Sequence, residues 1–283
     1  MYLGVDIGAT KTLVAVLDER GIIKEKTKFP TPQEYDNFLL ELRHTLAHLA
    51  TKDFKAGAIA VPGWLDRQHG RVIRLGSLRW ANKPSQWVNK PIQADCEKIC
   101  HCPLATENDA NLAGLSEAML LPEYDKVAYV TISTGIGTGF VDHQQLDPGL
   151  LDSEGGKVLL PHKDKLVPWE NFASGKAFYK HFGKKVADIP PSDIVAWQYI
   201  ARHLAPGLYT NIAITQPDVI VIGGSVGTYF EHFAKPLREE LKHYELPVVE
   251  IPKLTKAQRP EEAVVYGCYD MAKQRFGHGK NNS

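Results

Sequence analysis

The sequence has few of the features that mark secreted, membrane-spanning or nucleic-acid-binding proteins. Only 4 of its 283 residues are cysteines, too few for a disulfide scaffold, which favours a reducing cytoplasm as the compartment. No apolar run reaches the roughly 18 residues that span a bilayer, and the start of the chain lacks the basic and apolar regions of a signal peptide. Lys+Arg and Asp+Glu both number 33, so no basic excess indicates nucleic acid as a partner. These absences favour a globular cytoplasmic protein that binds neither membranes nor nucleic acid.

Two familiar site motifs are absent as well. The sequence contains neither the P-loop pattern G-x-x-x-x-G-K-[ST] nor the zinc-protease pattern H-E-x-x-H. One cluster stands apart, formed by Cys96, Cys100, His101 and Cys102 with the spacing C-x3-C-H-C. This spacing lacks the C-x2-C pairs of common structural zinc sites, so buried thiols are favoured and metal binding stays an open alternative.

The chain alternates short apolar runs with turns and helical patterns, which predicts a mixed α/β fold. The expected strands lie at 2–7, 12–17, 22–29, 56–61, 127–133 and 219–222. The expected helices lie at 38–49, at about 110–118, at 193–216 despite Pro206, between 228 and 243, and at 263–276. Residues 64–100 are less regular and are interpreted as a hairpin and a loop.

Two turns rich in Gly and Thr share one pattern. They suggest that the chain has two halves, each beginning with a strand, a turn and a second strand. Residues 6–12 read DIGATKT and residues 133–139 read STGIGTG, with strands expected on both sides of each turn. Glycine lets a backbone approach an anion closely, and main-chain N–H groups in such turns form concave donor sets for phosphate. Each turn alone also fits an ordinary hairpin, but the pair favours two loops that hold a polyphosphate. Asp6, at a strand end, is a candidate Mg²⁺ ligand, directly or through water.

A polar triplet, Glu107-Asn108-Asp109, opens a predicted helix. Asn and Asp are good N-caps, so capping is the stronger interpretation from local sequence. The functional alternative is that Asp109 accepts the proton of a substrate hydroxyl while Asn108 holds a neighbouring hydroxyl, as phosphorylation of an alcohol requires.

Six segments, in this order, resemble the ROK-type sugar kinases of the actin/hexokinase/Hsp70 ATPase superfamily. They are DIGATKT at 6–12, VPG at 61–63, ENDAN at 107–111, STGIGTG at 133–139, WENFASG at 169–175 and DVIVIGGSVG at 218–227. The resemblance runs from about Met1 to Phe276. It implies a two-domain actin-like ATPase (ribonuclease H-like) α/β fold with an interdomain cleft. The expected N-terminal domain is 1–117, with the C-terminal helix in 262–283 packed back on it, and the larger C-terminal domain is 118–261.

The resemblance also implies roles for single positions. Asp109 matches the general base that accepts the sugar hydroxyl proton. The positions that match sugar contacts are Gly63, Asn82, Asn108, Asp109, Glu154, Lys157 and Glu170. The positions that match ATP-binding segments are Asp6, Gly8, Thr10, Lys11, Thr134, Gly135, Gly137, Gly223 and Gly224. Asn82 is the weakest match, because WANKP stands where the family usually has a sequence like PNLPG.

The sequence departs from the family pattern at two places. The family commonly has G-E-x-G-H, whose His touches the sugar and a structural zinc, but here Lys157 stands at the His position behind a retained Glu154. The family's zinc-binding cysteine cluster is replaced by residues 162–170, which contain no cysteine. We therefore expect no structural zinc, and we expect Lys157 to influence the choice of sugar.

The resemblance implies an ATP-dependent, Mg²⁺-assisted hexose kinase of the glucokinase type, which is often a homodimer. Glucose is the first candidate substrate, and fructose, mannose, allose and N-acetylated amino sugars stay open. A sugar-binding regulatory or non-catalytic ROK protein is the alternative function, although a strand beginning at Tyr2 leaves no room for an N-terminal DNA-binding module. Polyphosphate is the alternative donor; ATP is favoured because no dense Lys/Arg run lies beside the two turns.

Overall fold

The computed structural model describes residues 1–75, 86–244, 246–259 and 261–277. The chain divides into two compact units, here called unit 1 (Met1–Ser116 and Glu261–Ser283) and unit 2 (Glu117–Pro260). Each unit contains a five-stranded mixed sheet. No helix in the described part of the chain is both long enough and apolar enough to cross a bilayer.

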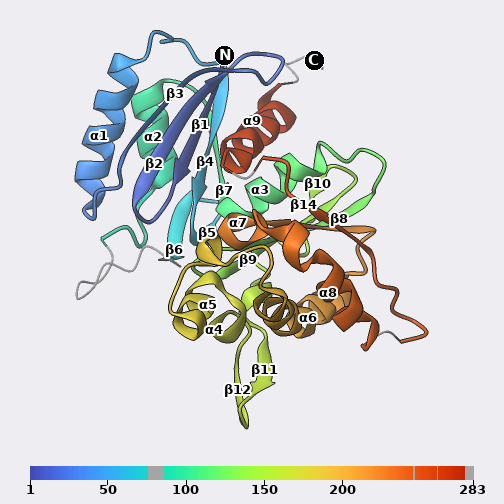
Figure 1. Ribbon diagram of the computed structural model, residues 1–283. Helices are drawn as coiled ribbons and strands as arrows, with labels where there is room; N and C mark the ends of the chain where they lie inside the picture. Colours follow the sequence, from blue (N-terminus) through green and yellow to red (C-terminus); the bar gives the residue numbers. More distant parts are fainter. Residues whose placement is uncertain (76–85, 245, 260, 278–283) are drawn as a thin grey trace. The chain divides into compact units, whose positions relative to one another are not determined.

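Unit 1 is a sheet with helices on both faces (Figure 1). Its sheet has the strand order β3-β2-β1-β4-β7. The strands are β1 (Tyr2–Ile7), β2 (Lys11–Leu17), β3 (Ile23–Pro30), β4 (Ala56–Val61) and β7 (Leu104–Asn108). The helices are α1 (Tyr35–His48), α2 (Ile92–Cys100), α3 (Asp109–Ala118, whose end belongs to unit 2) and α9 (Ala263–Phe276). A separate two-stranded hairpin is formed by β5 (Gly63–Asp66) and β6 (Arg71–Leu75).

The alternation of side chains along the strands explains these two layers. On β1, Leu3, Val5 and Ile7 belong to the core cluster that contains the buried faces of α1 and α2. Tyr2 belongs to the cluster on the other face, where its ring packs edge-on against Tyr269 of α9 with ring centroids 5.3 Å apart. A strand with period two can bury both faces only if both are apolar. The C-terminal helix is thereby part of the core of unit 1.

Unit 2, like unit 1, begins with two antiparallel strands joined by a turn rich in Gly and Thr. Its sheet has the strand order β10-β9-β8-β13-β14, in which β8 and β9 form an antiparallel pair and β8, β13 and β14 run parallel. The strands are β8 (Lys126–Ile132), β9 (Ile136–Asp142), β10 (Gln145–Leu146), β13 (Val219–Gly223) and β14 (Lys253–Lys256). The two turns rich in Gly and Thr thus connect equivalent strand pairs, β1–β2 in unit 1 and β8–β9 in unit 2.

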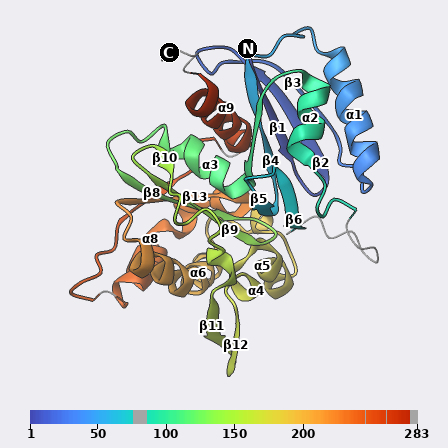
Figure 2. The same ribbon diagram turned by 180° about the vertical axis from the view of Figure 1, so that it is seen from behind.

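One face of the second sheet is covered by helices, seen from both sides in Figures 1 and 2. The helices of unit 2 are α4 (Glu170–Ala173), α5 (Gly175–Phe182), α6 (Ile194–Thr215), α7 (Gly224–Gly227) and α8 (Phe230–Lys242). Helix α6 contains Pro206 at its centre without ending there. A two-stranded hairpin, β11 (Leu159–His162) and β12 (Lys165–Pro168), projects from this unit (Figure 2).

The sequence-based interpretation of residues 64–100 is wrong in one respect. The hairpin is present as β5 and β6, but Ile92–Cys100 forms helix α2 where the sequence pattern predicts a loop. Its buried residues are Ile92, Cys96 and Cys100, one per turn at a spacing of four. The apolar stripe is therefore narrow, and two of its three members are the cysteines of the C-x3-C-H-C cluster.

Candidate active site

The carboxyl ends of three parallel strands bring the predicted residues of unit 1 together. β1 pairs with β4, and β4 pairs with β7, all in parallel register. Asp6 lies opposite Ala60, and Ala60 lies opposite Glu107. Ligand sites of open α/β sheets lie at this edge, because loops at the carboxyl ends of the strands meet there. Asp6, Gly63 and the triplet that ends β7 thus share one edge of the sheet.

Asp6 and Asp109 form a pair of carboxylates with raised pKa values. Burial and the nearby negative charge of Asp109 together raise the pKa of Asp6 to about 7, against the opposing charge of Lys11. Burial also raises the pKa of Asp109, against the N–H of Ala110 that donates to its Oδ1 over 2.9 Å. Two partly buried carboxylates whose charges interact favour protonation of one of them or the binding of a nearby cation. All-oxygen donors of this kind suit Mg²⁺.

The first glycine turn is short and is held by a residue that the sequence did not single out. The N–H of Gly8 donates to the Lys11 carbonyl over 3.1 Å, and a Cβ at position 8 would lie 2.9 Å from that same oxygen. Thr31, beyond the end of β3, donates its hydroxyl to the Gly8 carbonyl over 2.8 Å, and its hydroxyl lies 3.0 Å from that of Thr12. The Thr31 N–H also donates to the Thr10 carbonyl. Thr31 therefore fixes the turn from the side of β3.

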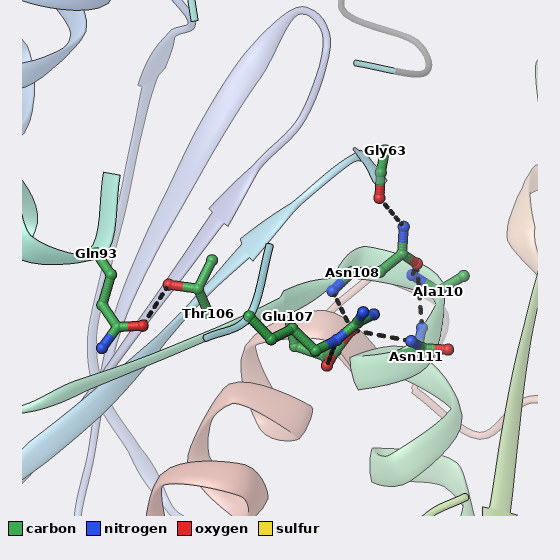
Figure 3. Close-up of polar contacts among 8 residues, drawn as sticks. Gly63, Gln93, Thr106, Glu107, Asn108, Ala110 and Asn111 are labelled. Atoms are coloured by element: carbon green, nitrogen blue, oxygen red, sulfur yellow. Dashed lines mark hydrogen bonds and ion pairs between the residues drawn. The ribbon is translucent and has the colours of Figure 1, made fainter. Parts of the chain in front are cut away.

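Asn108 both caps helix α3 and contacts the backbone of Gly63 (Figure 3). Its Oδ1 accepts from the Ala110 N–H over 2.8 Å, and its Nδ2 donates to the Gly63 carbonyl over 3.2 Å. Gly63 has a φ of 118°, a conformation that favours glycine. The capping and the functional interpretations of this triplet are thus compatible, because the side chain that caps the helix also joins it to Gly63.

The second glycine turn is fixed within unit 2 by Ser133. Its N–H donates to the Gly135 carbonyl over 2.9 Å, and its carbonyl accepts from the Gly175 N–H over 2.7 Å. Its hydroxyl accepts from the Ser225 N–H over 3.0 Å. Gly224, at a φ of 78°, approaches the same residue so closely that a Cβ there would lie 2.7 Å from the Ser133 Oγ. One serine therefore joins the 133–139 turn to the 223–227 turn and to the start of α5.

Lys157 forms an ion pair with Glu170, and Glu170 also reaches the second glycine turn. The Lys157 ammonium donates to Glu170 Oε1, while Oε2 accepts from the Ile136 N–H over 3.2 Å. A Cβ at Gly135 would lie 2.7 Å from the same Oε2. The Lys157 side chain is 51% exposed and that of Glu170 is 21% exposed. The pair thus joins a predicted sugar contact to a predicted phosphate turn.

The other predicted positions of unit 2 lie close to these residues in the chain. Gly137 is half-buried in β9 and pairs with Thr131 of β8, and Thr134 is exposed in the turn. Glu154 is exposed just before the turn of 3-10 helix at Gly155–Lys157. In unit 1, Thr10 and Lys11 are exposed. Asn82 lies outside the described residues, so its predicted sugar contact stays a prediction.

The segment that replaces the family's cysteine cluster folds as the hairpin β11–β12 and the start of α4. His162 stacks on Phe172 with ring centroids 4.6 Å apart, and the ring of His203 in α6 lies 5.8 Å from that of His162. Burial lowers the pKa of His203, and His162 and His181 lower it further by their charge. The described residues contain no group of three or more His, Cys, Asp or Glu side chains able to hold a metal ion. The absence of zinc stays a prediction.

The thiols of Cys96 and Cys100, in α2, and of Cys102, just after it, are buried. The Cys102 and Cys100 sulfurs are 3.5 Å apart, and His101, between them, is exposed in the left-handed conformation that ends the helix. This arrangement fits the thiol interpretation of the cluster, with Cys96 and Cys100 on the core side of α2.

Comparison with known proteins agrees with this arrangement of segments. The model of the ROK family matches residues 2–275. The chain belongs to the ROK family. An N-acetyl-D-glucosamine kinase from Citrobacter koseri is 28% identical, over 95% of this chain and 98% of the relative. A second such kinase, from Escherichia coli O127:H6, is 27% identical over the same shares.

The fold also matches solved structures of the family. A ROK glucokinase from Streptomyces griseus, in complex with glucose and AMPPNP, superposes with a TM-score of 0.80 at 22% identity, over 96% of this chain and 99% of that one. At this identity the likeness concerns the fold alone. The family and the two-domain α/β actin-like fold expected from the sequence are confirmed.

Proposed function

We propose that this ROK protein transfers the γ-phosphoryl group of ATP to a hydroxyl of a hexose. The observation that carries the proposal is the position of Asp109: a partly buried carboxylate that begins α3 directly after the carboxyl end of β7, close enough to Asp6 for its charge to raise the pKa of that residue, and in the unit that contains the first glycine turn. Phosphoryl transfer needs little covalent help from a protein; it needs phosphate oxygens held in place and a group that orients and deprotonates the attacking hydroxyl.

Asp109 is the proposed general base. The pKa of Asp109 is raised toward neutral pH. A general base is most effective when its pKa lies near the pH at which the enzyme works. Asn108 and Gly63 hold neighbouring sugar hydroxyls, and Glu154, Lys157 and Glu170 are the proposed sugar contacts from unit 2. Asn82 is retained as a further proposed contact.

The two glycine turns are the proposed phosphate-binding loops, with backbone N–H groups as donors. Thr10 and Lys11 add a hydroxyl and a positive charge in unit 1; Thr134, Gly135 and Gly137 line the second turn, and Gly223 and Gly224 the nucleoside side. Mg²⁺, when bound with the nucleotide, supplies charge neutralisation of the phosphates. Asp6 is its proposed protein ligand, directly or through water, because carboxylate oxygens are ligands that a hard cation prefers and Asp6 lies next to the first glycine turn.

The sugar is proposed to be a gluco-configured hexose, with N-acetyl-D-glucosamine and glucose as the first candidates. The names of the curated relatives support the former, and that of the S. griseus structure supports the latter. Lys157, one of the proposed sugar contacts, has an ammonium group that can donate a hydrogen bond to an acceptor such as the amide carbonyl of an N-acetyl group.

The test is a screen of donors against acceptors with the purified protein. ATP and polyphosphate are each combined with glucose, N-acetylglucosamine, mannose, fructose and allose, and the sugar phosphate is measured by mass spectrometry. We expect ATP-dependent product with at least one hexose. Sugar binding by calorimetry without product from any donor would contradict the kinase proposal and would favour a non-catalytic, sugar-binding protein.

A further inference from the structure

Glu107 lies at the centre of a buried network next to the proposed base. Its side chain is only 2% exposed. Arg67 donates to it twice, from Nε to Oε2 over 2.6 Å and from Nη2 to Oε1 over 2.7 Å. The Asn108 N–H and the Asn111 Nδ2 also donate to Oε1, over 2.7 and 2.9 Å (Figure 3). One carboxylate thus receives four hydrogen bonds from three residues.

Arg67 belongs to a different element from the residues that it helps to hold. It follows β5, in the loop that leads to β6, 40 positions before Glu107 in the chain. The first residue of β5, Gly63, is itself bonded to Asn108. The β5–β6 hairpin therefore holds the end of β7 at two points: one on the Glu107 carboxylate and one on the Asn108 amide.

These contacts act on the backbone that carries Asp109. The Glu107 carboxylate binds the peptide N–H of Asn108, and the Asn108 side chain binds the N–H of Ala110. The backbone on both sides of Asp109 is thereby held by side chains. A rotation of Glu107 would break its bond to the Asn108 peptide, which directly precedes Asp109.

We propose that Arg67 is a positioning residue, which fixes Glu107 through a two-point ion pair and so aims the Asp109 carboxylate at the substrate hydroxyl. Arginine suits this role because its planar guanidinium donates two parallel hydrogen bonds, which fix orientation as well as charge. The inference rests on the proposed function, since it requires Asp109 to be the base.

The experiment separates positioning from plain stabilisation. Arg67→Met leaves the buried Glu107 charge without its cation, so it should lower both the thermal stability and kcat. Adding Glu107→Gln removes that charge, so the double variant should recover most of its stability, but its side chain at position 107 has no guanidinium to fix its orientation. Its kcat should stay about tenfold or more below that of the unchanged protein, because misaligned catalytic groups are slow even in a stable fold. The KM for ATP should not change.

A double-mutant cycle with Asp109→Asn distinguishes positioning of the base from a purely structural role. It compares the effect of the substitutions at Arg67 and Glu107 on kcat in the presence and in the absence of Asp109. Once the base is removed, its aim no longer matters, so adding Arg67→Met and Glu107→Gln to Asp109→Asn should change kcat less than about twofold. The control is Asp66→Asn, which removes the ion pair with His69 in the same hairpin, keeps an oxygen that can accept from the His69 N–H, and should leave kcat and stability nearly unchanged.

The possible failures are distinguishable. If Asp109→Asn lowers turnover but the Arg67→Met/Glu107→Gln variant turns over normally, Arg67 does not position the base. The same conclusion follows if the double substitution lowers kcat equally with and without Asp109. If Asp109→Asn itself keeps normal turnover, the assigned base is wrong, and both the proposed mechanism and the role of Arg67 are lost.

Discussion

Replacing Asp6 by asparagine should stabilise the protein at pH 8 and abolish phosphoryl transfer. Burial and the neighbouring charge of Asp109 raise the pKa of Asp6 from 3.8 to about 7. Between these two pH values the folded protein holds a proton that the unfolded chain has lost. The stability of the unchanged protein should therefore fall as the pH rises from 4 to 7.

The magnitude follows from the size of the shift. A difference of roughly three pH units at 1.36 kcal/mol each corresponds to about 4 kcal/mol at pH 8. Asparagine at this position still buries a polar amide, at a cost of about 1–2 kcal/mol. The expected net gain for Asp6→Asn is about 2–3 kcal/mol at pH 8. It should fall to zero near pH 5, because the free energy needed there to keep Asp6 protonated in the fold is only about as large as the cost of the amide.

Urea unfolding at pH 4, 5, 6, 7 and 8, without metal or nucleotide, measures this gain. Asp53→Asn is the matched control, because Asp53 is an exposed carboxyl in the same unit. Its effect on the free energy of unfolding should be small and should not follow this pH profile. An Asp6→Asn variant that is less stable than the unchanged protein at pH 8, or whose gain does not vary with pH, would refute the account of the carboxylate pair.

Three further predictions concern the first glycine turn, the ring of His203 and the zinc content of the protein. Thr31→Val removes the hydroxyl that binds the Gly8 carbonyl; it should lower the free energy of unfolding by about 1 kcal/mol and raise the KM for ATP in steady-state kinetics. His203→Phe keeps a ring against Tyr199. Because the pKa of His203 is lowered in the fold, the unchanged protein should lose stability below about pH 6.5 relative to this variant, measured by urea unfolding at pH 5 and 7.5. Metal analysis of the purified protein should find less than one zinc per chain; stoichiometric, tightly held zinc would contradict this expectation.

Local patterns were sufficient to predict the main elements of the fold. The two turns rich in Gly and Thr lie between antiparallel strands as expected, and the helix across Pro206 runs from Ile194 to Thr215. These predictions depend on residues close together in the chain. The narrow apolar stripe of α2 was too weak to predict a helix, because only one buried residue per turn faces the core.

The contacts that support the candidate site could not be predicted in the same way. Glu107 was part of a recognisable triplet, but its partner Arg67 lies 40 positions away in an irregular stretch. Thr31 similarly acts across 23 positions on Gly8. Nothing in the local sequence distinguishes such residues from exposed polar ones, because their burial and bonding depend on how the strands pair.

The central claim is that Asp109 deprotonates a sugar hydroxyl, and the Asp109→Asn variant tests it most directly. Sugar affinity is measured by calorimetry and turnover by sugar phosphate formation, on the same preparation and with the sugar that the screen identifies. We predict a nearly unchanged Kd for the sugar and a kcat lower by on the order of 10²–10⁴. A variant that binds the sugar and still turns over at close to the normal rate would contradict the claim.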